Sequence, residues 1–95
     1  MLIVDEFDWD DGNWPKCGSH GVTKAEIESL FGNDPLIVPD PFPHENRLRA
    51  IGKVGSGRHV YCVFTLRETR LRPISARFMH EKEVQRYEQE RAKEV

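Results

Sequence analysis

The sequence predicts an α+β fold in which helices cover one face of an antiparallel β-meander. Three segments with strand-like patterns, at residues 47–54, 58–66 and 70–77, follow one another with only short turns between them. Residues 23–31 and 80–93 instead show the capping signals and apolar spacing of helices. Strands in succession with helices before and after them are typical of the α+β class.

The N-terminal part predicts a strand followed by two helices. Residues 2–9 are apolar and then alternating, which indicates an edge strand. A short helix is expected next, with Asn13 as its N-cap and Pro15 in its first turn. Thr23 and Glu26 then form the capping box of a longer helix. Its apolar stripe consists of Ile27, Leu30 and Phe31.

The central part predicts the meander. Residues 36–38 form a brief strand, and the proline-rich residues 39–43 connect it to the next one. Arg47, Arg49 and Lys53 lie on one side of strand 47–54. Gly55-Ser56-Gly57 then turns the chain into strand 58–66, which is apolar at both parities and is therefore expected to be buried on both faces.

The C-terminal part predicts an edge or bulged strand and a weakly held helix. Pro73 cannot donate a hydrogen bond within a sheet, so strand 70–77 should lie at an edge or contain a bulge. The helix at residues 80–93 has only Val84 and Tyr87 as an apolar side. Such a thin stripe predicts a helix that is loosely docked or completed by a partner.

Composition indicates a small cytoplasmic domain. Ninety-five residues suffice for one modest core, so we expect a single domain at 1–95. No apolar run approaches the roughly 18 residues that span a bilayer, and the acidic N-terminus does not resemble a signal peptide. We therefore expect a cytoplasmic protein without a membrane partner, whose Cys17 and Cys62 are free thiols, with Cys62 buried.

Charge is sorted along the chain although the net charge is only −2. Residues 1–46 carry ten acidic and two basic residues, whereas residues 47–82 carry nine basic and two acidic ones. One interpretation is a cationic face that binds an anionic partner such as nucleic acid. The other is that the two halves neutralise each other within the fold.

Several motifs together resemble the BrnT family of bacterial type II toxins over residues 7–87. They are FDWDDGN at 7–13, SHGVTKAEIESLF at 19–31, D-P-x-x-H-E-x-R at 40–47, IGKVGSGR at 51–58, VFTLR at 63–67 and RPISARFMHEKE at 72–83. The resemblance implies a RelE-like ribonuclease toxin that cleaves RNA without a metal and so inhibits translation. It also implies a BrnA-like ribbon-helix-helix antitoxin, through which alone the complex contacts operator DNA.

Cleavage of RNA without a metal requires cations on the phosphate and groups that transfer two protons. Arginine can grip phosphate oxygens bidentately, and histidine titrates near neutrality. The predicted catalytic residues are His20, Glu45, Arg47, Arg72 and Arg77. Residues predicted to contact RNA are Trp9, Lys53 and Arg70, and those predicted to contact the partner are Val84 and Tyr87. Three of these residues also have a structural alternative: a loop histidine for His20, an ion pair for Glu45, and core packing for Trp9.

No cofactor or metal is expected, because Cys17-x-x-His20 lacks a second half of a metal site. Two departures from the family pattern suggest an alternative function. Ser19 stands where the family usually has Lys, and the acidic–basic stretch at 40–47 is shortened. Both changes fit a catalytically weakened scaffold that acts only in antitoxin binding and autorepression. A third hypothesis is nucleic-acid binding by the arginine-rich sheet without cleavage.

Overall fold

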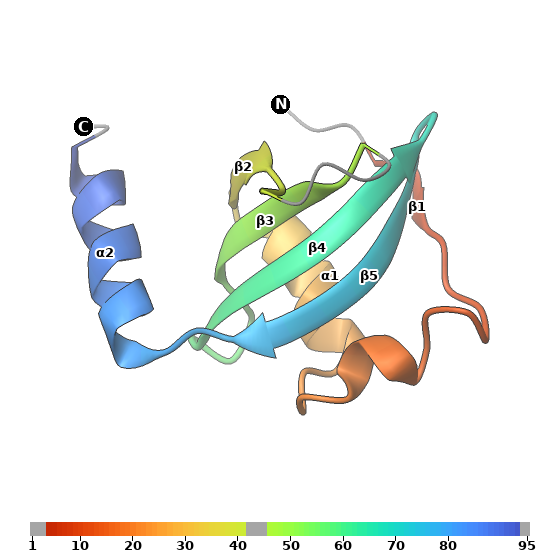
Figure 1. The fold of residues 1–95 in the computed structure, drawn as a ribbon, viewed down its shortest axis with the longest axis horizontal. Coiled ribbons are helices and arrows are strands. Elements are labelled where there is room, and N and C mark those ends of the chain that lie inside the picture. Colours follow the sequence, from red (N-terminus) through yellow and green to blue (C-terminus); the bar gives the residue numbers. More distant parts are fainter. Residues whose placement is uncertain (1–3, 42–45, 94–95) are drawn as a thin grey trace.

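A five-stranded mixed sheet and two α-helices form an α+β fold in the computed structural model, which describes residues 4–41 and 46–93 (Figure 1). The sheet order is β1-β5-β4-β3-β2. The elements are β1 (Glu6–Phe7), the 3-10 helix η1 (Lys16–Gly18), α1 (Lys24–Gly32), β2 (Leu36–Pro39), β3 (Leu48–Lys53), β4 (His59–Arg67), β5 (Arg70–Phe78) and α2 (Glu81–Ala92).

The predicted meander is confirmed for β2 to β5, which pair antiparallel in sequence order. The expectation of a wholly antiparallel sheet is wrong, because the edge strand β1 runs parallel to β5. Within the described residues β1 is also shorter than predicted, comprising Glu6 and Phe7. β1 and β2 are the two edges of the sheet, so the chain must cross a whole sheet face between them, and α1 makes that crossing (Figure 1).

The helix α1 packs on one face of the sheet and forms the core with it. The Thr23–Glu26 capping box is confirmed, with both reciprocal hydrogen bonds present. Ile27 and Leu30 are completely buried. They pack with a larger set of buried residues: Cys17, Val22, Ala50, Val54, Val60, Cys62, Phe64, Leu71 and Ala76. The expectation that the helices share one face is not confirmed, since α2 stands beside the sheet (Figure 1).

The prediction that β4 is buried on both faces is wrong. Val60, Cys62 and Phe64 are fully buried, whereas the residues between them remain partly exposed. Their burial alternates because α1 covers only the face to which the even-numbered residues point. Tyr61 and Val63 therefore lie on the opposite face, here called the open face of the sheet.

A β-bulge in β5 determines which of its residues reach the open face. Phe64 pairs with Pro73 and Val63 pairs with Ser75, so Ile74 is an extra residue opposite the β4 pair. Of the two alternatives predicted for Pro73, an edge strand or a bulge, the structure shows the bulge, since β5 lies between β1 and β4. Leu71 and Pro73 are buried before the bulge, and Ala76 is buried after it. The alternation therefore shifts by one residue, and Arg77 lies on the open face.

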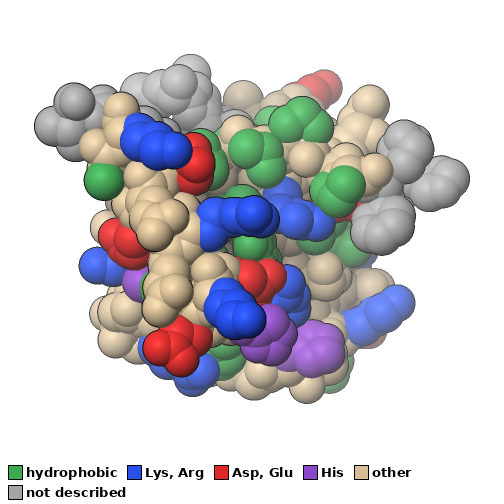
Figure 2. Space-filling view, turned by 60° about the vertical axis from the view of Figure 1, so that its left-hand side comes forward, with side chains coloured by type: hydrophobic (Ala, Val, Ile, Leu, Met, Phe, Trp, Pro, Cys, Tyr) green, Lys and Arg blue, Asp and Glu red, His purple; other side chains and the backbone are tan. Residues whose placement is uncertain are grey.

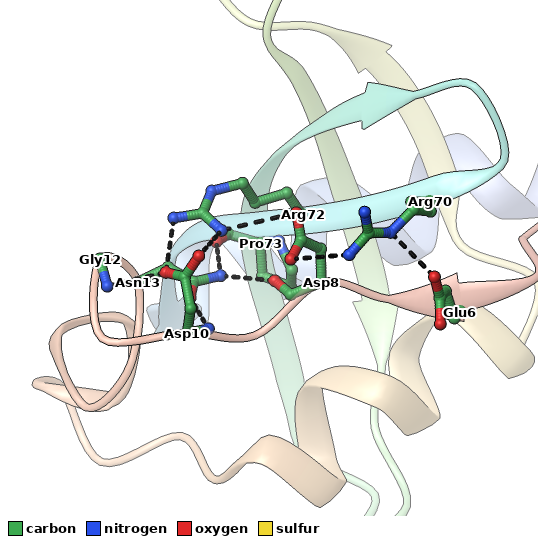
Figure 3. Close-up of polar contacts among 8 residues, drawn as sticks. All are labelled: Glu6, Asp8, Asp10, Gly12, Asn13, Arg70, Arg72 and Pro73. Atoms are coloured by element: carbon green, nitrogen blue, oxygen red, sulfur yellow. Dashed lines mark hydrogen bonds and ion pairs between the residues drawn. The ribbon is translucent and has the colours of Figure 1, made fainter.

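The acidic segment before η1 is attached to β5 through a buried asparagine (Figure 3). The prediction that Asn13 is the N-cap of the short helix is wrong. The N-cap is Pro15, which makes no side-chain capping hydrogen bond. The Asn13 side chain, 2% exposed, instead donates to the carbonyls of Asp8 and Pro73 at 2.9 Å each. Its oxygen accepts the Asp10 N–H at 2.8 Å. One amide therefore joins the loop to the bulged strand.

The helix α2 is docked by polar and aromatic contacts. None of the described side chains between Glu81 and Ala92 is buried, which agrees with the thin apolar side seen in the sequence. Completion of the helix by a partner stays a prediction. Glu88 contacts His59 at 2.7 Å, Arg91 contacts Asp34 at 3.0 Å, and the Tyr87 ring packs edge-on against His59. In the part of the chain that the structure describes, no helix is long and apolar enough to cross a membrane.

We predict that Asn13→Ala lowers the free energy of unfolding by about 3 kcal/mol, because the Pro73 carbonyl loses its buried hydrogen bond and the Asp8 carbonyl and Asp10 N–H lose part-buried ones. Urea denaturation measures this change. The control is Asn33→Ala, which removes one exposed hydrogen bond to the Lys53 carbonyl and should cost about 1 kcal/mol or less. Equal losses in the two variants would contradict the structural role of Asn13.

Candidate functional site

A small hollow on the open face of the sheet brings together two of the predicted catalytic residues, His20 and Arg77. Its volume is about 130 Å³. It is lined by His20, Arg49, Tyr61, Val63, Ser75, Ala76 and Arg77. Three neighbouring strands, β3, β4 and β5, and the loop after η1 contribute to it. Rigid strands thus hold two arginines and a tyrosine around one cavity.

Both arginines of the hollow lie close to the ring of Tyr61. The guanidinium carbon of Arg77 lies 4.6 Å from the centre of the Tyr61 ring, and that of Arg49 lies 5.3 Å away. Tyr61 pairs directly with Arg77 on β5, and Val63 pairs with Arg49 on β3, so both arginines flank the same segment of β4. Burial raises the pKa of Tyr61, and the nearby Glu83 carboxylate adds to this effect. The hydroxyl therefore stays protonated at neutral pH.

Arg77 is held by the first turn of α2. Its Nη1 and Nη2 atoms each donate to one oxygen of Glu83, both at 2.9 Å. The same carboxylate accepts the His80 N–H at 2.8 Å, which closes the N-terminus of α2. The Arg77 guanidinium, followed by the His80 N–H, lowers the pKa of Glu83 to about 2. Glu83 is thus ionised at neutral pH.

Arg49 is held from the other side of the hollow. Its Nη2 donates to the Asp40 carboxylate at 3.1 Å, and that carboxylate is 4% exposed. Its Nε atom is buried and has no hydrogen-bond partner among the described residues. Arg49 thus brings a cationic side chain, already paired with Asp40, to the wall of the hollow.

His20 reaches the hollow through the turn that follows η1. Gly21 adopts a positive φ of 91°, which glycine tolerates, and this turn leads from His20 into the α1 capping box. Cys17, three residues earlier, is buried, and burial raises the pKa of its thiol to about 11. Within 4–41 and 46–93, no three His, Cys, Asp or Glu residues gather to hold a metal ion.

The hollow combines a titratable imidazole with two guanidinium groups and a neutral phenol, which is a chemistry suited to phosphate esters. The family model that describes the BrnT ribonuclease toxin of type II toxin–antitoxin systems matches residues 9–83. The chain belongs to this family. A comparison with curated proteins finds no match. The type II family implies an RNA target and an antitoxin partner for this BrnT-family chain.

Two of the predicted catalytic residues, His20 and Arg77, meet in the hollow. Arg72 lies on the same face of β5 but away from the hollow, with its guanidinium donating to both Asp10 oxygens at 2.9 Å (Figure 3). Arg47 precedes β3, and its buried Nε has no hydrogen-bond partner among the described residues. Glu45 lies outside the described residues, so its predicted role stays a prediction.

The predicted RNA-contacting residues lie elsewhere on the BrnT-family fold. Arg70 pairs with Glu6 at 2.9 Å and with Asp8 at 3.2 Å. Trp9 packs beside the core, and its indole N–H donates to Glu28 at 2.8 Å. Lys53 is exposed at the end of β3. None of these three side chains lines the hollow, and their contact with RNA is untested.

The two residues predicted to contact a partner are on α2. Val84 and Tyr87 are each partly exposed. Tyr87 already contributes to intramolecular docking, because its ring lies 5.6 Å from that of His59 and its hydroxyl lies beside Gly52. A partner that binds here would therefore contact a helix that is already docked against the rest of the domain.

The two oppositely charged halves of the chain neutralise each other at the β1 edge. The pairs there join Glu6, Asp8 and Asp10 to Arg70 and Arg72. In the view of Figure 2, basic and acidic side chains are intermingled. The described residues thus favour the neutralisation alternative at that edge, while Arg49 and Arg77 line the hollow.

Sequence reasoning missed Arg49, Tyr61 and Glu83 as parts of the site. Arg49 lies on the charged side of its predicted strand, but the sequence does not distinguish it from Arg47 as a site residue. Tyr61 was not expected in the site, because β4 was wrongly predicted to be buried on both faces. Glu83 has a visible signal, since it lies three residues after His80 in a capping position and six after Arg77.

We predict that the stability difference between wild type and Glu83→Gln depends on pH. The pKa of Glu83 falls from 4.5 to about 2 in the folded chain, so its ion pair stabilises the fold above about pH 4.5. That stability is lost as pH falls toward about 2. Thermal unfolding across this range should show the two melting temperatures converging at low pH. The matched control is Glu81→Gln, which removes an exposed carboxylate from the same turn, and its difference from wild type should be smaller at neutral pH.

Proposed function

We propose that this chain is a metal-independent endoribonuclease toxin whose active site is the hollow on the open face of the sheet. The observation that carries the proposal is the convergence of His20, Arg49, Tyr61 and Arg77 in one cavity of a BrnT-family chain. The cleavage of cytoplasmic RNA would inhibit translation. A BrnA-like antitoxin would neutralise the enzyme, and contact with operator DNA would occur through that antitoxin.

In the proposed reaction, the ribose 2′-oxygen attacks the adjacent phosphorus atom. The 2′-oxygen–phosphorus bond forms, the bond from phosphorus to the 5′-oxygen breaks, and a 2′,3′-cyclic phosphate results. One group must accept the 2′-proton and another must give a proton to the leaving 5′-oxygen. His20 is the candidate for one of these transfers, because an imidazole titrates near neutral pH. Glu45 remains the predicted second group.

The arginines would stabilise the charge that develops on the non-bridging phosphate oxygens. Arg77 and Arg49 approach from two different strands, so one phosphate between them would receive donors from two sides. The Tyr61 hydroxyl, whose raised pKa keeps it protonated, lies next to them. Fixed donors of this kind act without reorganisation in the transition state, which is why cations here can replace the charge of a metal.

We predict that Arg77→Ala abolishes toxicity when the chain is expressed without its antitoxin. The loss of one charge-assisted contact in the transition state costs about 3 kcal/mol, or roughly a hundredfold in rate. Growth of bacteria and decay of purified RNA both measure the effect. The control is Arg86→Ala, which removes an exposed arginine of α2 outside the hollow. If Arg77→Ala is as toxic as the wild type, the proposed phosphate contact is contradicted. If the wild-type chain is itself not toxic, the scaffold alternative is supported.

We predict that RNA cleavage survives chelation. The reason is that the hollow supplies cationic side chains in place of a divalent ion. Adding EDTA to purified protein and following RNA decay tests this, with a magnesium-dependent nuclease as the positive control for chelation. Loss of activity that a divalent ion restores would refute the metal-free mechanism and would favour Cys17 and His20 as ligands.

We predict that the chain forms a salt-resistant complex with the product of an adjacent antitoxin gene. Type II complexes of this kind should bury more than about 2,000 Å² with apolar anchors, for which Val84 and Tyr87 on α2 are candidates. Co-purification in high salt measures the stability of the complex, and Val84→Ala should weaken it. Dissociation by moderate salt would show a mainly electrostatic interface, and no binding at all would remove the antitoxin from the proposal.

A further inference from the structure

The guanidinium of Arg77 is only partly used by its contacts within the chain. A guanidinium carries five N–H donors in a fixed plane. Nη1 donates to Glu83 at 2.9 Å and to the Phe78 carbonyl at 3.3 Å, and Nη2 donates to the other Glu83 oxygen at 2.9 Å. These three bonds occupy both hydrogens of Nη1 and one of Nη2.

The two remaining hydrogens form a second fork. They are the Nε–H and the other Nη2–H, which lie parallel on one edge of the guanidinium and match the two oxygens of a phosphate. Among the described residues, no hydrogen bond to either of these hydrogens is found. Arg77 lines the hollow, and its side chain is 41% exposed.

Glu83 is itself fixed from two sides. Its carboxylate is bound end-on to Arg77 and also accepts the His80 N–H at 2.8 Å as part of the capping box of α2. The Tyr61 ring packs against the guanidinium at 4.6 Å and limits its rotation. The orientation of Arg77 is thus determined by a carboxylate at its end, a carbonyl beside it and an aromatic ring against its plane.

We propose that Glu83 is a positioning residue that holds Arg77 end-on, so that the side-on fork binds an RNA phosphate in the hollow. The inference rests on the proposed ribonuclease function and adds a role for α2 in it. Glu83 and the phosphate occupy different edges of one guanidinium and are bound at the same time. Glu83 is a poor proton acceptor in the reaction, because the ion pair with Arg77 stabilises its ionised form against protonation.

The first experiment compares Glu83→Gln with Glu81→Gln in steady-state RNA cleavage. Gln can still accept the His80 N–H, so Glu83→Gln removes the ionic hold on Arg77 while keeping the cap. A misplaced catalytic group costs up to about a hundredfold in rate, so we expect kcat to fall at least about tenfold. KM should not rise, because a negative charge near the phosphate is lost. Glu81→Gln should keep both constants.

The second experiment needs no variant. Inorganic phosphate is added to the wild-type chain, and NMR follows the Arg77 Nε–H and the Glu83 carboxyl carbon. We expect the Nε–H resonance to shift while the Glu83 carboxyl resonance stays in place, because phosphate binds the free edge. A shift of the Glu83 carboxyl resonance would show that phosphate displaces Glu83, which would overturn the proposal and make Glu83 a competitor.

The outcomes separate this inference from the proposed function. A wild-type chain that cleaves no RNA refutes the ribonuclease proposal, whereas the phosphate titration still tests the side-on fork. Active wild type with an unchanged kcat in Glu83→Gln refutes the positioning role alone. A lower kcat counts in favour only if circular dichroism shows Glu83→Gln to be as folded as Glu81→Gln at the assay temperature.

Discussion

The extra residue Ile74 in β5 is the constraint on which the candidate site depends. In a regular strand, side chains alternate strictly, and Arg77 would point to the same face as Leu71 and Pro73, into the core. An unpaired guanidinium in that core would cost several kcal/mol. The bulge shifts the alternation by one residue and brings Arg77 to the open face beside Tyr61. A strand rich in arginine is thereby compatible with a buried apolar face.

The acidic N-terminal segment completes the site by attaching to the same strand. Its ion pairs with Arg72 are individually weak at a surface, but Asn13 adds three hydrogen bonds in a buried position. This attachment fixes the start of the segment that runs through η1 to His20. Arg70 and Arg72 are paired with acidic residues of this segment, whereas Arg49 and Arg77 line the hollow with carboxylate partners of their own.

The helix α2 links the hollow to the surface on which we propose that the antitoxin binds. Its first turn holds Arg77 through Glu83, and its later turns contact the body through Glu88 and Arg91. Because none of its described side chains is buried, it is held mainly by pairs that water and salt weaken. In the proposed function, a partner that binds α2 therefore acts on the element that orients a phosphate-binding arginine.

The sequence by itself determined the family, the meander and the α1 capping box. It also limited the strand with Pro73 to an edge or a bulge, and it provided the final helix with only a thin apolar side. These features depend on local chemistry: apolar spacing, a reciprocal cap, and a proline without an N–H. The tertiary structure alone decided that β1 is parallel and that β4 is open on one face, because both depend on where α1 lies. It alone also brought Arg49, Tyr61 and Glu83 to Arg77. Those contacts join different strands and a helix, and no local pattern encodes which face a residue reaches after a bulge.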